Sequence, residues 1–212
     1  MKTKGISKDF VKSNVIYIVF AVMLVGLSIF SESFLSITNI TNILRQSSLV
    51  GIVALGMTYI MIAGGIDLSV GSTIALAACV SASLSTTMGT VLPLPVALLA
   101  GVLVGVLVGI INGYVVAYLG IVPFITTLGM QSIVRGVALV YTSGKPINAL
   151  TDSYVAIGKS SLFGIPTPAI IFMVLAIITW FFLSKTKYGR YLYAIGGNEE
   201  AATVAGLKVK FL

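Results

Sequence analysis

The sequence contains no histidine, one cysteine and only six acidic residues among its 212 positions. Without histidine it lacks the usual ligands of haem iron and catalytic zinc, and Cys79 alone can form neither an internal disulfide bond nor a thiolate cluster. The carboxylates are scattered, and the adjacent Glu199 and Glu200 would point apart on a helix. The phosphate-binding pattern G-x-x-x-x-G-K-S/T is also missing. We therefore expect no metal, no cofactor and no enzymatic activity in this chain.

Charged residues are scarce as well, at 9% of the chain, whereas apolar residues make up 58%. The mean hydropathy is +1.09. Soluble domains contain about a quarter charged residues, so this chain has too few to cover a surface that faces water. A bilayer core about 30 Å thick needs roughly 20 apolar residues for each helical span, and several stretches meet that length. The sequence predicts an all-α, polytopic membrane protein.

Six membrane spans are predicted from apolar length and from the glycine and proline residues at the turns between them. Counts of five and seven remain open. The apolar body of the first span is long for a cleaved secretory signal, which favours a retained span. The predicted spans are 14–31, 48–64, 68–87, 91–112, 123–142 and 166–184.

Lysine and arginine predict the orientation in the membrane. If the N-terminus is cytoplasmic, nine of these residues lie on the inside and three on the outside, as the positive-inside rule requires, and Arg135 lies in a span. The net charge of +7 then reflects topology and not nucleic-acid binding. The inside residues are Lys2, Lys4, Lys8, Lys12, Lys185, Lys187, Arg190, Lys208 and Lys210, and the outside residues are Arg45, Lys145 and Lys159.

Two spans carry regular patterns. Gly101, Gly105, Gly109 and Gly113 recur every four residues in the fourth span, which predicts a bare face on which another helix packs closely; a seam that slides during transport is the alternative. In the fifth span, Thr127, Gln131 and Arg135 recur at the same interval. Such polar residues usually face the bundle interior or an aqueous path, although Arg135 near a span end could extend to the headgroups. These three are candidate pathway residues.

The segment AGGIDLSVG holds the only charged residue between Arg45 and Arg135, namely Asp67. A carboxylate within a bilayer costs about 3 kcal/mol. Asp67 follows a glycine turn and precedes an apolar helix, so we expect it to cap that helix, with help from Ser69. A direct role in substrate handling or gating is the alternative. The residues of this signature turn are Gly64, Gly65, Asp67, Ser69 and Gly71.

Three segments carry a resemblance to a known family: GMTYIMIAGGIDLSVGS, NGYVVAYLGIVPFITTLGMQSIVRG and YGRYLYAIGGNEEAATVAGLKV. Together they resemble the membrane permease subunits of ABC importers for sugars, particularly those of the ribose type, over essentially the whole chain. The resemblance implies a second permease copy, a separate cytoplasmic ATPase, and a periplasmic or lipid-anchored binding protein that delivers the sugar. It also implies a multi-pass protein of the bacterial inner membrane that forms the translocation pathway.

The segment 196–206 is expected to form a short cytoplasmic helix. Asn198 is a favourable N-cap residue, and Glu199 and Glu200 are favourable near the positive N-terminal end of a helix. Gly206 is favourable where the helix ends. The residue pattern alone also fits a segment that only connects two elements at the membrane interface. The resemblance implies a coupling helix that docks on the ATPase. The predicted coupling residues are Gly196, Gly197, Asn198, Glu199, Glu200, Ala201, Ala202 and Gly206.

The family's permeases continue through further spans beyond the point where this chain stops. We therefore expect 1–212 to be a single permease domain that is incomplete relative to the family. Three alternatives remain: a permease for branched-chain amino acids, an ion-coupled transporter or channel, and a fragment without transport activity. An ion-coupled transporter should show several intramembrane carboxylates and an inverted repeat, and the sequence shows neither.

Overall fold

The computed structural model describes residues 14–211, so the predictions for Lys2, Lys4, Lys8 and Lys12 lie outside the described residues. The chain divides into two compact units, Met1–Gln46 and Ser47–Leu212, which are described separately. In the described part, helices account for nearly all regular structure, and the named strands are one hairpin of two-residue strands. The all-α prediction is confirmed.

The first unit contains α2 (Val15–Phe30) and the start of α3 (Ile37–Ile62), which continues into the second unit. α3 begins well before the predicted span at 48–64. Its first turn is stabilised by Ser36, whose hydroxyl accepts a hydrogen bond from the amide of Asn39 at 3.2 Å. Because the first turns of α3 are polar, a prediction based on apolar length missed them.

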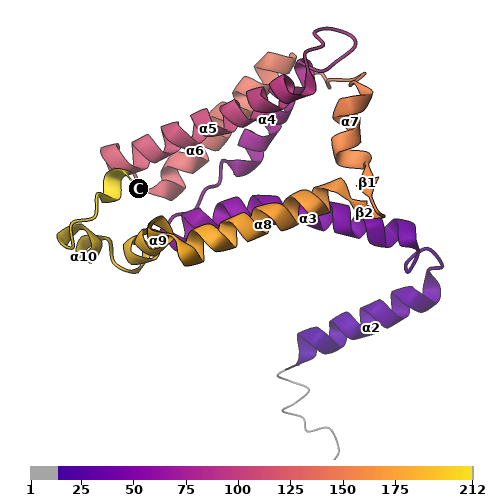
Figure 1. Ribbon diagram of the computed structural model, residues 1–212, viewed down its shortest axis with the longest axis horizontal. Helices are drawn as coiled ribbons and strands as arrows, with labels where there is room; N and C mark the ends of the chain where they lie inside the picture. Colours follow the sequence, from indigo (N-terminus) through magenta and orange to yellow (C-terminus); the bar gives the residue numbers. More distant parts are fainter. Residues whose placement is uncertain (1–13, 212) are drawn as a thin grey trace, which may run out of the picture. The chain divides into compact units, whose positions relative to one another are not determined.

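The second unit contains three helices that pack on one another (Figure 1). Their shared core is small and consists of Leu76, Val108, Val134 and Ala138. Each of the two longer helices has a proline in its first turn, where the missing N–H costs no hydrogen bond. The three helices are α4 (Val70–Ser83), α5 (Leu94–Leu119) and α6 (Pro123–Thr142).

Two other helices of this unit, α3 and the helix at Thr167–Lys185, run parallel to each other. The ring of Phe172 on α8 (Thr167–Lys185) lies against Gly51 on α3, and Phe182 lies 5.6 Å from Tyr59 between ring centroids. The glycine matters, because a Cβ at Gly51 would lie 2.6 Å from the Phe172 ring. After α8 the chain forms α9 (Lys187–Gly197), α10 (Glu199–Val204) and the 3-10 helix η1 (Val209–Phe211).

Hydrogen bonds join the loop that follows α4 to the loop that precedes the short helix at Asp152–Lys159. The hydroxyls of Ser85 and Thr151 lie 2.7 Å apart, and Thr86 donates to the Asn148 carbonyl at 2.7 Å. These bonds explain why α4 ends before the predicted limit of 87. The remaining elements here are α7 (Asp152–Lys159), β1 (Ser161–Leu162) and β2 (Ile165–Pro166).

Among residues 14–211, four helices are long and apolar enough to cross a membrane: α3, α5, α6 and α8. α2 and α4 are apolar but contain 16 and 14 residues. At 1.5 Å per residue, α4 is about 21 Å long, less than the thickness of about 30 Å of the bilayer core. The predicted six spans therefore correspond to four full-length helices and two shorter ones. The predicted span 91–112 extends to Leu119.

Candidate functional site

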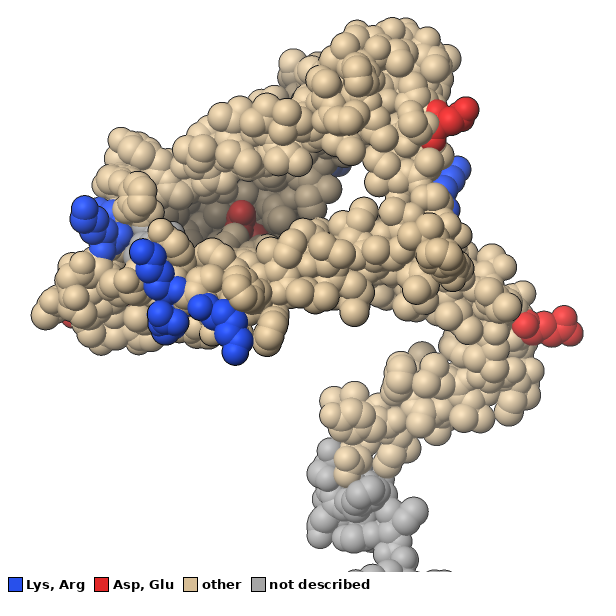
Figure 2. Space-filling view, viewed as in Figure 1, with Lys and Arg blue, Asp and Glu red and all other residues tan. Residues whose placement is uncertain are grey.

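A cavity of about 850 Å³ lies in the second unit. Its walls come from the end of α3 and the turn that follows it, the second half of α5, the start of α6, and parts of α9 and η1. Figure 2 shows a hollow in the mostly tan surface, with red, acidic atoms inside it. Three polar side chains from different elements line the cavity: Asp67 from the turn after α3, Asn112 from α5 and Thr127 from α6.

The predicted signature turn forms one wall of this cavity. Oδ1 of Asp67 accepts hydrogen bonds from the backbone N–H of Ser69 at 2.7 Å and from its hydroxyl at 2.6 Å. Ser69 is fully buried and is the N-cap residue of α4, but its side chain makes no capping hydrogen bond. Asp67 was expected to cap the first turn of α4. Its carboxylate instead accepts both hydrogen bonds from Ser69, two residues ahead, and closes a short turn before the helix.

Glycine shapes the same turn. Gly64 has a φ of +87°, a left-handed conformation that residues with a Cβ rarely adopt. Gly65 lies close to Ile60, whose Cγ2 would be 3.2 Å from an added Cβ. Gly71 has open space beside it in the described part of the chain. Gly64, Gly65 and Asp67 line the cavity, whereas Gly71 does not.

Asn112 joins this wall from α5, and the sequence analysis missed it. Its Nδ2 donates to the hydroxyl of Ser69 at 2.9 Å, so Asp67, Ser69 and Asn112 form one hydrogen-bonded chain. Asn112 is only 7% exposed, and its Oδ1 is buried without a hydrogen-bond partner among the described residues. Its one detectable signal is a carboxamide in an otherwise apolar stretch, which usually faces a bundle interior.

Only one of the three candidate pathway residues reaches the cavity. Thr127 is buried and lines it, and its hydroxyl donates to the carbonyl of Pro123 at 2.8 Å. Gln131 and Arg135 are exposed and lie outside the lining. Each step of four residues rotates a helix position by about 40°, so the three side chains diverge around α6. Of the three residues predicted to share a polar face, only Thr127 therefore faces the cavity.

The glycine pattern of α5 serves two purposes. A Cβ at Gly101 would lie 3.1 Å from the Ala77 carbonyl oxygen, so α4 and α5 approach closely there, as predicted. Gly105, Gly109 and Gly113 have no described atom within 4 Å of that position. Gly109 and Gly113 line the cavity instead. A continuous packing seam along all four glycines is therefore not formed within this chain.

Aromatic and charged residues complete the lining. Tyr59 and Tyr118 contribute rings, and Glu199 and Lys210 contribute opposite charges from the C-terminal elements. The lining thus combines aromatic surface with a few hydrogen-bonding groups, the usual composition of a site for a small molecule.

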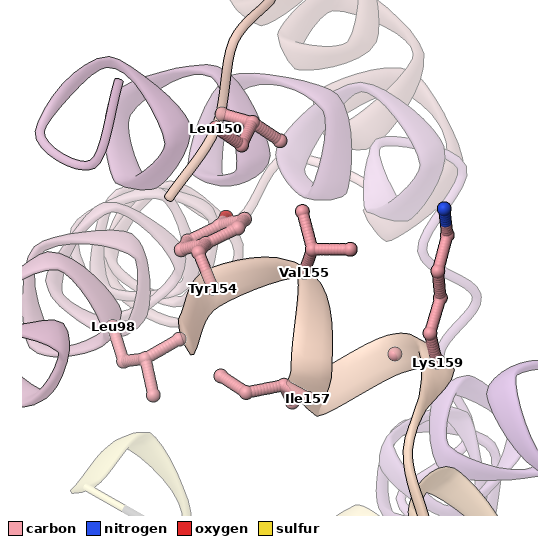
Figure 3. Close-up of a pocket in the computed structure, with 7 residues that line it drawn as sticks. Leu98, Leu150, Tyr154, Val155, Ile157 and Lys159 are labelled. Carbon is pink, nitrogen blue, oxygen red and sulfur yellow. The ribbon is translucent and has the colours of Figure 1, made fainter. Parts of the chain in front are cut away.

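A second cavity, of about 480 Å³, lies beside α7 (Figure 3). Figure 3 shows the side chains of Leu98, Leu150, Tyr154 and Val155 around it, with Lys159 at the end of the helix. Its lining is almost entirely apolar. Without several convergent polar groups it is a weaker candidate for a binding site than the first cavity.

The predicted coupling segment is divided at Asn198. Gly196 and Gly197 end α9, and Asn198 caps α10 by accepting a hydrogen bond from the Ala201 amide at 2.9 Å. The N-cap prediction is confirmed. Glu199 and Glu200 occupy the first turn of α10, and Gly206 follows the helix with a φ of +86°.

Two residues of this segment are packed within the chain. Ala202 is buried, at 5% exposure. A Cβ at Gly196 would overlap the carbonyl oxygen of Ile62, so the end of α9 lies directly on the end of α3. These two residues therefore fix the segment to the rest of the unit, and a docking partner would meet the exposed residues of α10.

Comparisons with known proteins place this architecture in a family. Residues 39–212 match the family described as branched-chain amino acid transport system / permease component. A ribose import permease protein of Bacillus subtilis is 42% identical over 190 residues, which make up 89% of this chain and 58% of that protein. An L-arabinose transport system permease protein of Escherichia coli is 38% identical over 192 residues, 91% of this chain and 58% of that protein.

A D-allose transport system permease protein of Escherichia coli is 37% identical over 184 residues, which make up 87% of this chain and 56% of that protein. The chain therefore spans less than two thirds of the length of these relatives. No solved structure matches it. Because the family match covers most of the chain, the protein belongs to the permease-component family of the branched-chain amino acid transport systems.

Proposed function

We propose that this protein is a transmembrane permease subunit of an ABC importer for a monosaccharide. The observation that carries the proposal is the likeness to permeases named for ribose, allose and arabinose, at 37–42% identity across most of the chain. The family description names branched-chain amino acids. The individual relatives named for sugars favour a sugar as the substrate, in agreement with a cavity that carries several hydrogen-bonding groups.

We place the end formed by α9, α10 and η1 in the cytoplasm of a bacterial cell, with the chain in the inner membrane. Figure 2 shows blue, basic side chains gathered at this end of the molecule. Lys145 and Lys159 belong to the loops and short helix at the other ends of the spans. This difference agrees with the positive-inside rule. The basic residues at the proposed cytoplasmic end are Lys185, Lys187, Arg190, Lys208 and Lys210.

The proposed partner at the cytoplasmic end is a separate ATPase. α10 and its C-cap residue present Ala201, Val204 and Ala205, which are exposed and lie at spacings of three and four residues from Ala201. Val204 is 89% exposed, an unusual position for an apolar side chain at the aqueous end of a membrane protein. We name these three residues the coupling surface, because a small apolar face suits a groove on a partner. A second permease copy and a sugar-binding protein on the opposite side complete the proposed transporter.

Deletion of the gene in its host tests the proposal. Uptake of radiolabelled D-ribose, D-allose, L-arabinose and L-leucine is measured in the parent, the deletion strain and the deletion strain that carries the gene on a plasmid. We expect the deletion to abolish high-affinity uptake of at least one sugar, the plasmid to restore it, and leucine uptake to stay unchanged. Loss of leucine uptake with normal uptake of all three sugars would refute the sugar assignment.

A further inference from the structure

We infer that the cavity beside Asp67 is a low-affinity binding site for the sugar within the permease, with Asp67 and Asn112 accepting hydrogen bonds from its hydroxyl groups. This inference rests on the proposed function and identifies the place in the chain where the substrate is held. The cavity volume of about 850 Å³ leaves ample room for a monosaccharide and several waters.

One carboxylate oxygen of Asp67 is free to accept hydrogen bonds from a ligand. Oδ1 accepts both hydrogen bonds from Ser69, whereas Oδ2 accepts none from the described residues. A carboxylate can accept about four hydrogen bonds, and Asp67 is half-buried in the cavity wall. Since a buried carboxylate is costly unless it is hydrogen-bonded, the exposure of Asp67 to this cavity indicates that the cavity holds water or a hydroxylated ligand.

Asn112 provides a second hydrogen-bond acceptor in the cavity wall. Its side chain is more than nine-tenths buried and lines the cavity, and its carboxamide oxygen has no partner among the described residues. An unpaired buried acceptor is destabilising unless a donor reaches it. The hydrogen bond from Nδ2 to Ser69 fixes the orientation of the amide and leaves its oxygen as the acceptor for a donor in the cavity.

The remaining lining of the cavity suits a sugar ring. Tyr59 and Tyr118 offer aromatic rings, which suit the apolar C–H face of a sugar ring. Gly109 and Gly113 leave the α5 wall free of side chains. Hydrogen-bond acceptors and aromatic rings around open space suit a neutral polyol, and the opposite charges of the lining, Glu199 and Lys210, both lie on the C-terminal elements.

The test uses the glycines of α5 as matched positions. Gly113 lines the cavity and Gly105 does not, yet both have space for a side chain. Cys79 is the only native cysteine, so the Cys79→Ser protein provides a background without thiols. Gly113→Cys and Gly105→Cys are each made in that background, with Gly109→Cys as a second cavity position, and are labelled in host membrane vesicles with a charged, water-soluble methanethiosulfonate reagent.

We expect Gly113→Cys to react at least about tenfold faster than Gly105→Cys, because a thiol in apolar surroundings has a raised pKa and little thiolate. D-ribose in excess should slow the reaction at Gly113→Cys, and L-leucine should not. Asp67→Asn should weaken this protection about tenfold in sugar concentration, since it removes a hydrogen bond to a charged acceptor. Asp152→Asn, which removes a carboxylate outside the lining, should leave the protection unchanged.

Three results would overturn the inference: no reaction at either cavity position in inserted protein, protection by leucine, or equal protection in the wild-type and Asp67→Asn backgrounds. The uptake experiment separates this failure from failure of the proposed function. If the deletion abolishes sugar uptake while Asp67→Asn changes neither labelling nor protection, only the binding site is wrong. If no sugar uptake depends on the gene, the proposed function itself fails.

Discussion

Replacement of Gly196 by alanine tests the contact between α9 and α3. An added Cβ would overlap the carbonyl oxygen of Ile62 and lie 3.4 Å from the carbonyl carbon of Ala63. Both neighbours are backbone atoms at the end of a helix, so no side-chain rotation can make room. We therefore expect Gly196→Ala to force the end of α9 away from α3.

The expected magnitude follows from two opposing effects. Overpacking typically costs about 1–3 kcal/mol, and the rigid backbone contact places this case at the upper end. Alanine in place of glycine in a helix returns up to about 1 kcal/mol. The net loss is about 2 kcal/mol, which corresponds to a Tm lowered by about 4–8 °C for a chain of this length.

Gly197→Ala is the matched control. Gly197 is the next residue of α9 and has no described atom within 4 Å of the Cβ position. It shares the gain in helix propensity without the overlap, so we expect an unchanged or slightly raised Tm. Unfolding is followed in detergent through the reaction of the half-buried Cys79 with a fluorogenic thiol reagent. Equal melting temperatures for the two variants would refute the proposed contact.

Two further predictions concern other helices. Gly101→Ala should lower the Tm relative to Gly105→Ala, by about 1 kcal/mol in stability, because the first meets α4 at 3.1 Å and the second meets open space; equal effects in the same assay would exclude a close α4–α5 contact. Val204→Asp should reduce co-purification of the ATPase with the permease, whereas Val204→Ile should not, because the charge would be desolvated in a partner's groove. Normal co-purification of the Val204→Asp protein would remove α10 from the ATPase interface.

The sequence predicted those features that depend on neighbouring residues or on long apolar runs. The α6 span matched at both ends, and the Asn198 cap was predicted because capping needs only a side chain and an amide three residues ahead. The start of α3 was missed because its first turns are polar, although Ser36 satisfies the amide of Asn39.

The cavity depends on which helices approach one another, and periodic patterns contain little of that information. Four-residue spacing suggests one continuous glycine face on α5, but each step rotates by about 40°, so Gly101 and Gly113 lie about 120° apart, and only Gly101 meets α4 closely. The partnership of Asp67, Ser69 and Asn112 joins residues more than forty positions apart. Asn112 could be suspected from its isolated polarity, but its contact with Ser69 follows from the tertiary packing of α4 on α5.

The central claim is that transport through this permease is driven by ATP and carries a monosaccharide. The most direct measurement is uptake of radiolabelled D-ribose, D-allose and L-arabinose into host membrane vesicles, with and without the protein, in the presence of the periplasmic fraction. The account predicts that one of these sugars accumulates only when the protein is present and ATP is supplied on the cytoplasmic side, whatever the ion gradient. Accumulation driven by a proton or sodium gradient in the absence of ATP would contradict it.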